Sequence, residues 1–213
     1  MPSFSAGGGN AMSPQPENPA IYAVKYADHA PSAEFTSEER SILLKLAHAA
    51  IESALTGQKL SFEPPSSHLA EPRGAFTTIY VGGQLRGCVG YVLAVYSLYR
   101  TVVETARSAA FEDTRFPPIT AEEVARLEVS LSILSPPQPI RAEEVEIGRH
   151  GLLVSQHGRR GLLLPQVPVE HGWDRVTFLE QTCRKAGLPT DAWRHGATLE
   201  GFTAEVFGEG GRK

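Results

Sequence analysis

One hexapeptide holds residue types that could do chemistry together, Leu85–Gly90 (LRGCVG). Side chains alternate along a strand, so one face should carry Arg86, Cys88 and Gly90, and the other Leu85, Gly87, Val89 and Tyr91. A neighbouring guanidinium favours the thiolate by lowering the pKa of a thiol from about 8.5. Cys88 is therefore a candidate nucleophile, and Arg86 would lower its pKa or bind an anionic substrate group. The alternative is a structural thiol, because free cysteine is usually a small buried hydrophobe.

A cysteine nucleophile needs a general base, and His171 is the candidate. It lies in the segment PQVPVEHGWD, between an expected strand and an expected helix. Connections of this kind often carry functional residues. In the same hypothesis Gln166 is an oxyanion-type donor. The alternative is that His171 is a polar loop or capping residue.

A second group of polar residues lies in the segment FEDTRF, which holds Asp113 and Arg115. Arginine and carboxylate form bidentate pairs, so Asp113 would orient Arg115 or Arg86. The alternative is a local salt bridge within a turn. Glycines weaken a strand, so their presence often marks a place where something approaches the backbone closely. The predicted substrate-binding residues are therefore Arg86, Gly87, Gly90, Asp113 and Arg115.

The sequence argues against several other classes of function. Its seven histidines form no His-x-x-His or His-Glu-x-x-His pattern and its two cysteines no Cys-x-x-Cys pair, so no metal site is expected. No cofactor is indicated. A net charge of −4 and a pI near 6.0 argue against a nucleic-acid partner. No apolar run approaches the ~20 residues of a membrane span and no signal peptide is visible, so we expect a cytoplasmic protein.

Periodicity and turn chemistry predict the elements that position these residues. A helix should run from Ser37 to about Thr56, because Thr36 and Glu39 form a capping box and Gly57 follows. Gly82-Gly83 separates two strand-like runs and predicts a hairpin that pairs Val81 with Gln84, Ile79 with Arg86 and Thr77 with Cys88. Further helices are expected over 98–112 and 174–186, and strands over 127–134, 151–155, 161–164 and 202–207. This mixture is typical of an α+β fold.

Proline-rich residues after position 134 suggest a subdomain boundary. We expect a disordered or extended N-terminal arm over 1–35 and a flexible tail over 209–213. A larger subdomain should comprise 36–134 plus 196–208. A smaller inserted subdomain should comprise 135–195.

The motifs resemble those of the AMMECR domain family. The hexapeptide matches the family hallmark, with Val89 where isoleucine is usual, and the match continues in SAAFEDTRFPPIT, LEVSLSILSPP, IGRHGLLV, GRRGLLLPQVPVEHGW and FTAEVF. The resemblance covers about residues 36–208. It implies two subdomains, each an antiparallel sheet with helices, with the hexapeptide near a cleft between them. It also implies Memo-type or radical-SAM-type proteins as partners, but no particular reaction.

Two functional hypotheses follow. In the first, the protein is a cysteine-dependent enzyme or enzyme component that acts on a small anionic or acyl substrate at the cleft. In the second, it is a non-catalytic binding or adaptor module. The hexapeptide edge would then bind a peptide, a small molecule or a partner protein.

Overall fold

The computed structural model describes residues 33–60 and 63–209. Its helices are α2 (Ser37–Thr56), α3 (Ser67–Ala70), α4 (Leu98–Phe111), α5 (Gln166–Glu170) and α6 (Arg175–Lys185). Its strands are β1 (Ala75–Val81), β2 (Gln84–Tyr91), β3 (Leu127–Leu134), β4 (Gln138–Pro139), β5 (Gly151–Gln156), β6 (Arg159–Leu163), β7 (Thr198–Phe202) and β8 (Ala204–Gly208). Short 3₁₀ turns cover Val124–Arg126, Ala142–Glu144 and Ala192–Arg194.

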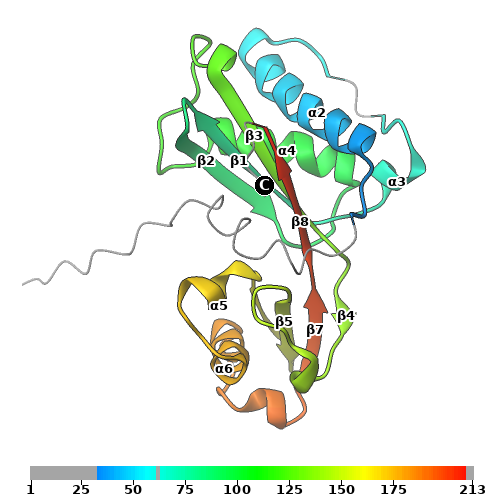
Figure 1. Cartoon of the computed structure of the whole chain (residues 1–213), viewed down its shortest axis with the longest axis vertical. Coiled ribbons are helices and arrows are strands. Elements are labelled where there is room, and N and C mark those ends of the chain that lie inside the picture. Colours follow the sequence, from blue (N-terminus) through cyan, green and yellow to red (C-terminus); the bar gives the residue numbers. More distant parts are fainter. Residues whose placement is uncertain (1–32, 61–62, 210–213) are drawn as a thin grey trace, which may run out of the picture.

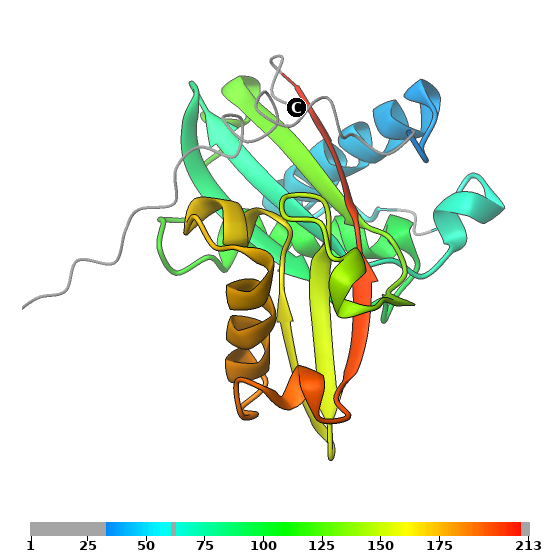
Figure 2. The same ribbon diagram turned by 60° about the horizontal axis from the view of Figure 1, so that its bottom comes forward.

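The strands form two antiparallel sheets, which confirms the predicted α+β class. The first sheet has the order β2-β1-β3-β8, and α2 and α4 pack on one of its faces (Figure 1). The second has the order β4-β7-β5-β6, and α6 lies along it (Figure 2). Strand β2 is thus an edge strand of the first sheet.

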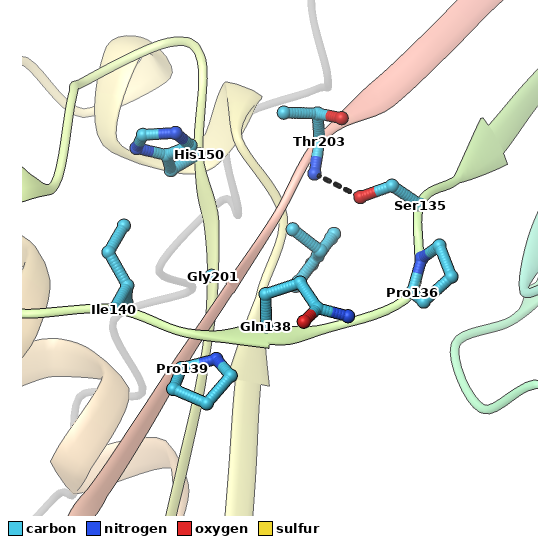
Figure 3. A pocket seen from close by; sticks show the side chains of 9 residues that line it. Ser135, Pro136, Gln138, Pro139, Ile140, His150, Gly201 and Thr203 are labelled. Atoms are coloured by element: carbon cyan, nitrogen blue, oxygen red, sulfur yellow. Dashed lines mark hydrogen bonds between the residues drawn. The ribbon is translucent and has the colours of Figure 1, made fainter. Parts of the chain in front are cut away.

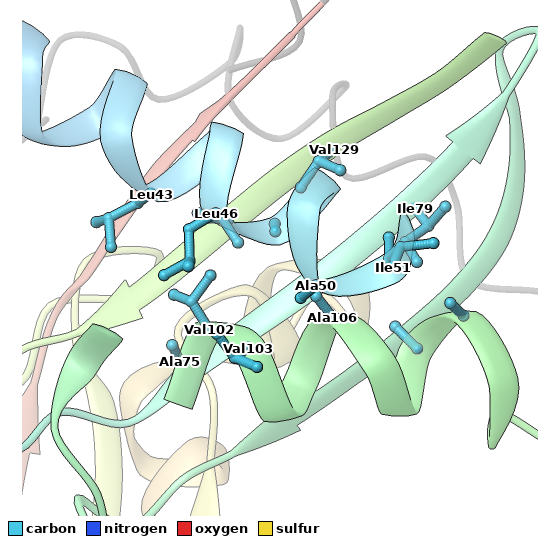
Figure 4. Packing of buried hydrophobic residues seen from close by; sticks show 14 of the residues in the cluster. Leu43, Leu46, Ala50, Ile51, Ala75, Ile79, Val102, Val103, Ala106 and Val129 are labelled. Carbon is cyan, nitrogen blue, oxygen red and sulfur yellow. The ribbon is translucent and has the colours of Figure 1, made fainter. Parts of the chain in front are cut away.

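The main hydrophobic core lies between the first sheet and its two helices. Leu46 of α2 and Val102 of α4 point toward one another beneath the strands, and Val129 of β3 and Ile79 of β1 meet the same helices (Figure 4). The beginning of α2 is as predicted, since Thr36 Oγ1 accepts from the backbone N–H of Glu39 and the Glu39 carboxylate accepts in return. Helix α2 ends at Gly57, whose φ is +73°.

The chain passes between the sheets at two places that lie side by side. Residues 135–137 lead from β3 to β4, and Thr203 alone separates β7 from β8. The backbone N–H of Ser135 donates to the carbonyl of Thr203 at 2.9 Å, and the N–H of Thr203 donates to Ser135 Oγ at 2.9 Å. We call residues 135–137 and Thr203 the crossing. These bonds tie the two sheets together.

The structure divides the C-terminal segment differently from the expected subdomain range 196–208. Strand β7 pairs with β4 and β5 of the second sheet, and only β8 joins the first. Leu199 of β7 contacts the small hydrophobic clusters of the second sheet. Glu209, at the start of the expected tail, accepts from the backbone N–H of Val129. The expected arm lies outside the described residues apart from 33–35.

The β1–β2 hairpin has the predicted Gly82-Gly83 turn but not the predicted register. Both glycines have positive φ, as a two-residue hairpin loop requires. The register shifts between Ile79 and Tyr80, so that Ile79 faces Gly87 and Thr78 faces Cys88. The predicted pairs of Ile79 with Arg86 and of Thr77 with Cys88 are therefore wrong. Arg86 is the extra residue of a β-bulge, a feature that re-aims a side chain.

Candidate functional site

The outer edge of β2 is covered at Cys88 by two side chains from the connection between α4 and β3, which lies outside β2 in Figure 1. The backbone N–H of Cys88 donates to Asp113 Oδ2 at 2.9 Å. Its carbonyl accepts from Arg115 Nη2 at 3.2 Å. Asp113 and Arg115 thus satisfy the two backbone groups that a neighbouring strand would otherwise bind.

Asp113 and Arg115 also pair with each other. Arg115 Nε and Nη2 donate to the two oxygens of Asp113 at 2.9 and 2.6 Å. The Asp113 side chain is 7% exposed, whereas that of Arg115 is 50% exposed. The hydrogen bonds from Arg115, followed by those from the backbone, lower the pKa of Asp113 to about 2, against the effect of burial. Of the two arginines considered for Asp113, the structure pairs it with Arg115.

Arg86 pairs with Glu123, a residue that the sequence analysis did not single out. Its Nε and Nη2 donate to the two oxygens of Glu123, each at 3.0 Å, and its Nη1 donates to the carbonyl of Pro117 at 3.0 Å. The sequence signal was the capping box at Thr120–Glu123, and Glu123 does accept from the backbone N–H of Thr120. Arg86 therefore fastens the bulge of β2 to the α4–β3 connection.

Cys88 is half-buried, and its environment opposes ionisation. Burial raises the pKa of the Cys88 thiol, and a hydrogen bond from Thr78 Oγ1 at 3.3 Å and the charge of Arg115 only partly offset this. The expectation that Arg86 lowers the pKa of Cys88 is therefore wrong. The bulge carries the Arg86 guanidinium to Glu123, and the net shift of the Cys88 pKa is upward.

The proposed base and oxyanion donor lie at the two ends of α5, which follows β6 of the second sheet. Gln166 begins this short helix, and His171 ends it. The His171 ring stacks on Trp173 with centroids 4.6 Å apart. No hydrogen bond or ion pair links a histidine to Cys88 within residues 33–60 and 63–209. His48, for example, binds Glu209 and His68 binds Glu39.

Close packing against β2 explains both glycines of the hexapeptide. A Cβ on Gly87 would overlap the backbone carbonyl oxygen of Ala109, because α4 packs directly on β2. A Cβ on Gly90 would overlap the ring of Phe76 on the adjacent strand. The close approach inferred from the sequence is thus made by a helix backbone and an aromatic ring of the protein itself.

Alkylation of Cys88 is expected to be slow at neutral pH, with a midpoint above the ordinary thiol pKa of about 8.5, because burial raises the pKa of Cys88. The rate of reaction with iodoacetamide would be followed against pH in a Cys183→Ser background, since Cys183 is fully buried. Arg115→Gln should move the midpoint higher, and Arg86→Gln should leave it unchanged. A midpoint below 8.5 that Arg86→Gln abolishes would contradict this expectation.

A pocket of about 220 Å³ lies beside the crossing, at the start of β4 and the end of β7 (Figure 3). Its lining includes Ser135, Gln138, His150, Phe202 and Thr203. None of the site residues predicted from the sequence lines it. Little in the sequence points to this site, because its residues are of ordinary types and come from distant segments.

The described residues show neither a metal-binding cluster nor a membrane-spanning helix. Among the residues that the structure describes, no three His, Cys, Asp or Glu side chains gather where they could hold a metal ion. None of the helices in that part of the chain is long and apolar enough to span a bilayer.

Comparisons with known proteins place this geometry in a family. The AMMECR1 family model matches residues 44–207. Protein MK0488 of Methanopyrus kandleri is 43% identical over 188 residues, covering 83% of this chain and 91% of its own. Protein MJ0810 of Methanocaldococcus jannaschii is 42% identical over 184 residues, covering 82% and 92%. The crystal structure of uncharacterized protein PH0010 from Pyrococcus horikoshii is similar with a TM-score of 0.64 and 40% identity, covering 79% of this chain and 90% of its own.

Proposed function

The chain belongs to the AMMECR1 family, and we propose that it is a non-catalytic binding module that takes up an extended segment of a partner protein along the outer edge of β2. The partner segment would add a strand to the first sheet, a mode in which backbone hydrogen bonds supply affinity and side-chain contacts supply specificity. The hexapeptide would serve as the framework of this edge.

The observation that carries the proposal is a difference in hydrogen bonding between the outward-facing backbone groups of Cys88 and those of Gly90. The backbone groups of Cys88 face away from β1 and are bound by Asp113 and Arg115. Backbone direction alternates along an antiparallel pair, so those of Gly90 face outward as well. No side chain among the described residues hydrogen-bonds to Gly90. Among residues 33–60 and 63–209, the edge is therefore covered at Cys88 and has no hydrogen-bond partner at Gly90.

The surface next to Gly90 has the chemistry of a peptide-binding site. Leu93 and Val95, in the loop that follows β2, are 49% and 65% exposed. Single exposed apolar residues are common, but two within three residues beside an unpaired strand edge favour an apolar partner. Arg115, which is half exposed beside Cys88, would donate to a carbonyl or carboxylate oxygen of the partner. We infer an extended segment with an acidic residue and apolar residues.

The environment of Cys88 weighs against the cysteine-dependent enzyme. A nucleophile requires a thiolate and a base within hydrogen-bond reach. Burial raises the pKa of Cys88, and the described histidines bind other groups or lie elsewhere. In the binding proposal, Cys88 is needed for its backbone groups and its packing, not for its thiolate.

The family resemblance suggests which partner proteins would supply the extended segment. Memo-type and radical-SAM-type proteins are the partner classes implied by the family resemblance, and they are the first candidates to test. The protein would meet them in the cytoplasm, where thiols such as Cys88 remain reduced.

Peptide selection tests the proposal. A displayed library of extended peptides with alternating apolar and acidic residues would be selected against the full chain. The double variant Leu93→Glu/Val95→Glu should weaken binding of the selected peptides by about tenfold or more, because it charges the apolar contact surface. Leu55→Glu is the matched control, since Leu55 is a 38% exposed leucine on α2, and it should leave binding unchanged. Equal binding by the wild type and the double variant would refute the proposed surface.

A further inference from the structure

The pocket at the crossing is lined by the crossing itself and by neighbouring residues of the second sheet and its connections. Ser135 and Thr203 come from the crossing, Gln138 comes from β4, and His150 directly precedes β5 (Figure 3). Phe202, the last residue of β7, completes this part of the lining. Its volume of about 220 Å³ lies below the ~300–1,000 Å³ of sites for drug-sized ligands. It could therefore hold a small molecule or one end of a larger one.

No polar side chain of the pocket carries a charge near pH 7. The lining contains no Asp, Glu, Lys or Arg. His150 is the one titratable group in it, and burial, together with the charge of Arg149, lowers the pKa of His150 and keeps the ring neutral near pH 7. Pro136, Gln138 and Pro139 are exposed, so the pocket is open to solvent on one side. A charged ligand would gain no opposite charge from the lining for the part of its hydration that it loses, which is costly. The pocket thus favours an uncharged ligand.

The pocket offers several hydrogen-bond donors. His150 Nδ1 accepts from the backbone N–H of Glu146 at 3.1 Å, which assigns the ring proton to Nε2 and leaves that atom as a donor. The Gln138 amide and the Thr203 hydroxyl make no side-chain hydrogen bond within the described chain. Ser135 Oγ accepts from the Thr203 backbone and keeps its own proton to donate. Such donors match a carbonyl oxygen.

The rest of the lining is apolar. It consists of Ile140 and Phe202 together with Pro136 and Pro139. Gly201 allows Ile140 to lie against β7, because a Cβ there would come within 2.9 Å of the Ile140 side chain. An apolar body would lie against this apolar lining while its polar group meets the donors.

We propose that this pocket binds a small uncharged molecule carrying a carbonyl or carboxamide group on an apolar body. The inference is independent of the β2 edge, since no residue of that edge lines the pocket. The ligand would contact both strands of the crossing and so bridge the segments that join the two sheets.

Benzamide and benzoate are a matched probe pair, because they have nearly the same shape but differ in charge. Amide chemical shifts of the ¹⁵N-labelled full chain would be followed during titration with each probe. Benzamide should bind with a dissociation constant of about a millimolar, as expected for so small a ligand, and shift the amides of Gln138, His150 and Thr203. Benzoate should bind at least about tenfold more weakly, because its charge is not compensated.

Two variants locate the site, with a control from the same strand region. Thr203→Val and Gln138→Leu each remove a polar group that makes no side-chain hydrogen bond within the described residues, and each should weaken benzamide binding about three- to tenfold. Thr198→Val, at the exposed far end of β7, should leave affinity unchanged. Benzoate binding as tightly as benzamide, shifts centred away from the crossing, no saturable shifts, or equal binding by all variants would each overturn the proposal.

Discussion

Replacing Gly87 by alanine is expected to destabilise the protein by about 3 kcal/mol or more, a large effect for a single methyl group. The added Cβ would overlap the carbonyl oxygen of Ala109, a backbone atom that cannot rotate away. Relief requires α4 to move off β2, and α4 is packed against α2 through the main core. The free energy of unfolding would be measured by urea denaturation.

Gly57→Ala is the control for this variant. Gly57 has a positive φ of +73°, but nothing lies within 4 Å of its added Cβ. Its cost should be only the backbone strain of an alanine in the left-handed region, about 1–2 kcal/mol. If Gly87→Ala costs no more than Gly57→Ala, the helix does not pack on the strand as closely as described. The account of Gly87 as a packing residue would then fail.

Replacing Asp113 by asparagine is expected to cost about 2 kcal/mol of stability at neutral pH. The carboxylate accepts from the Cys88 backbone and from Arg115, and its side chain is nearly buried. Hydrogen bonds to a charged group contribute more than neutral ones, and an asparagine has only one accepting oxygen. One of these donors would be left without an acceptor.

The pH dependence of stability gives an independent check on Asp113. Its pKa is about 2 in the folded protein and near 3.8 when unfolded, so the unfolded state binds its proton first as the pH falls. The stabilisation, about 2 kcal/mol, is present above pH 4 and is lost as the pH falls from about 4 to 2. Asp113→Asn should remove this part of the acid-induced loss. Glu122→Gln, an exposed carboxylate in the same connection, should not. Identical acid profiles for the wild type and Asp113→Asn would contradict the assignment.

Local sequence signals predicted some elements well and others poorly. Helix α2 was predicted with its observed bounds because its start and stop depend on neighbouring residues, Thr36, Glu39 and Gly57. The bulge at Arg86 was not predicted, because its partner Glu123 lies 37 residues away in sequence. Strand β7 was missed apart from its last residue, since it is short, contains Gly201 and gains its pairing from β5.

The candidate site was likewise predictable only where it depends on local sequence. The sequence suggested that Asp113 pairs with Arg115 or Arg86, but not that Asp113 and Arg115 bind the backbone of Cys88. What they do together was not foreseen, because the roles of backbone N–H and C=O groups at a sheet edge depend on register. The pocket at the crossing could not be read from the sequence either, since Gln138, His150 and Thr203 meet only through the pairing of β4, β7 and β5.

Mapping a selected peptide onto the ¹⁵N-labelled chain tests the binding account of β2 most directly. The account predicts that amide shifts and slowed hydrogen exchange centre on Gly90 and continue through Leu93 and Val95. It also predicts that they persist in Cys88→Ser, because the thiolate plays no part. Perturbations centred on Gln166 and His171 instead, or peptide binding that Cys88→Ser abolishes while the fold is retained, would contradict the account and return attention to the thiol.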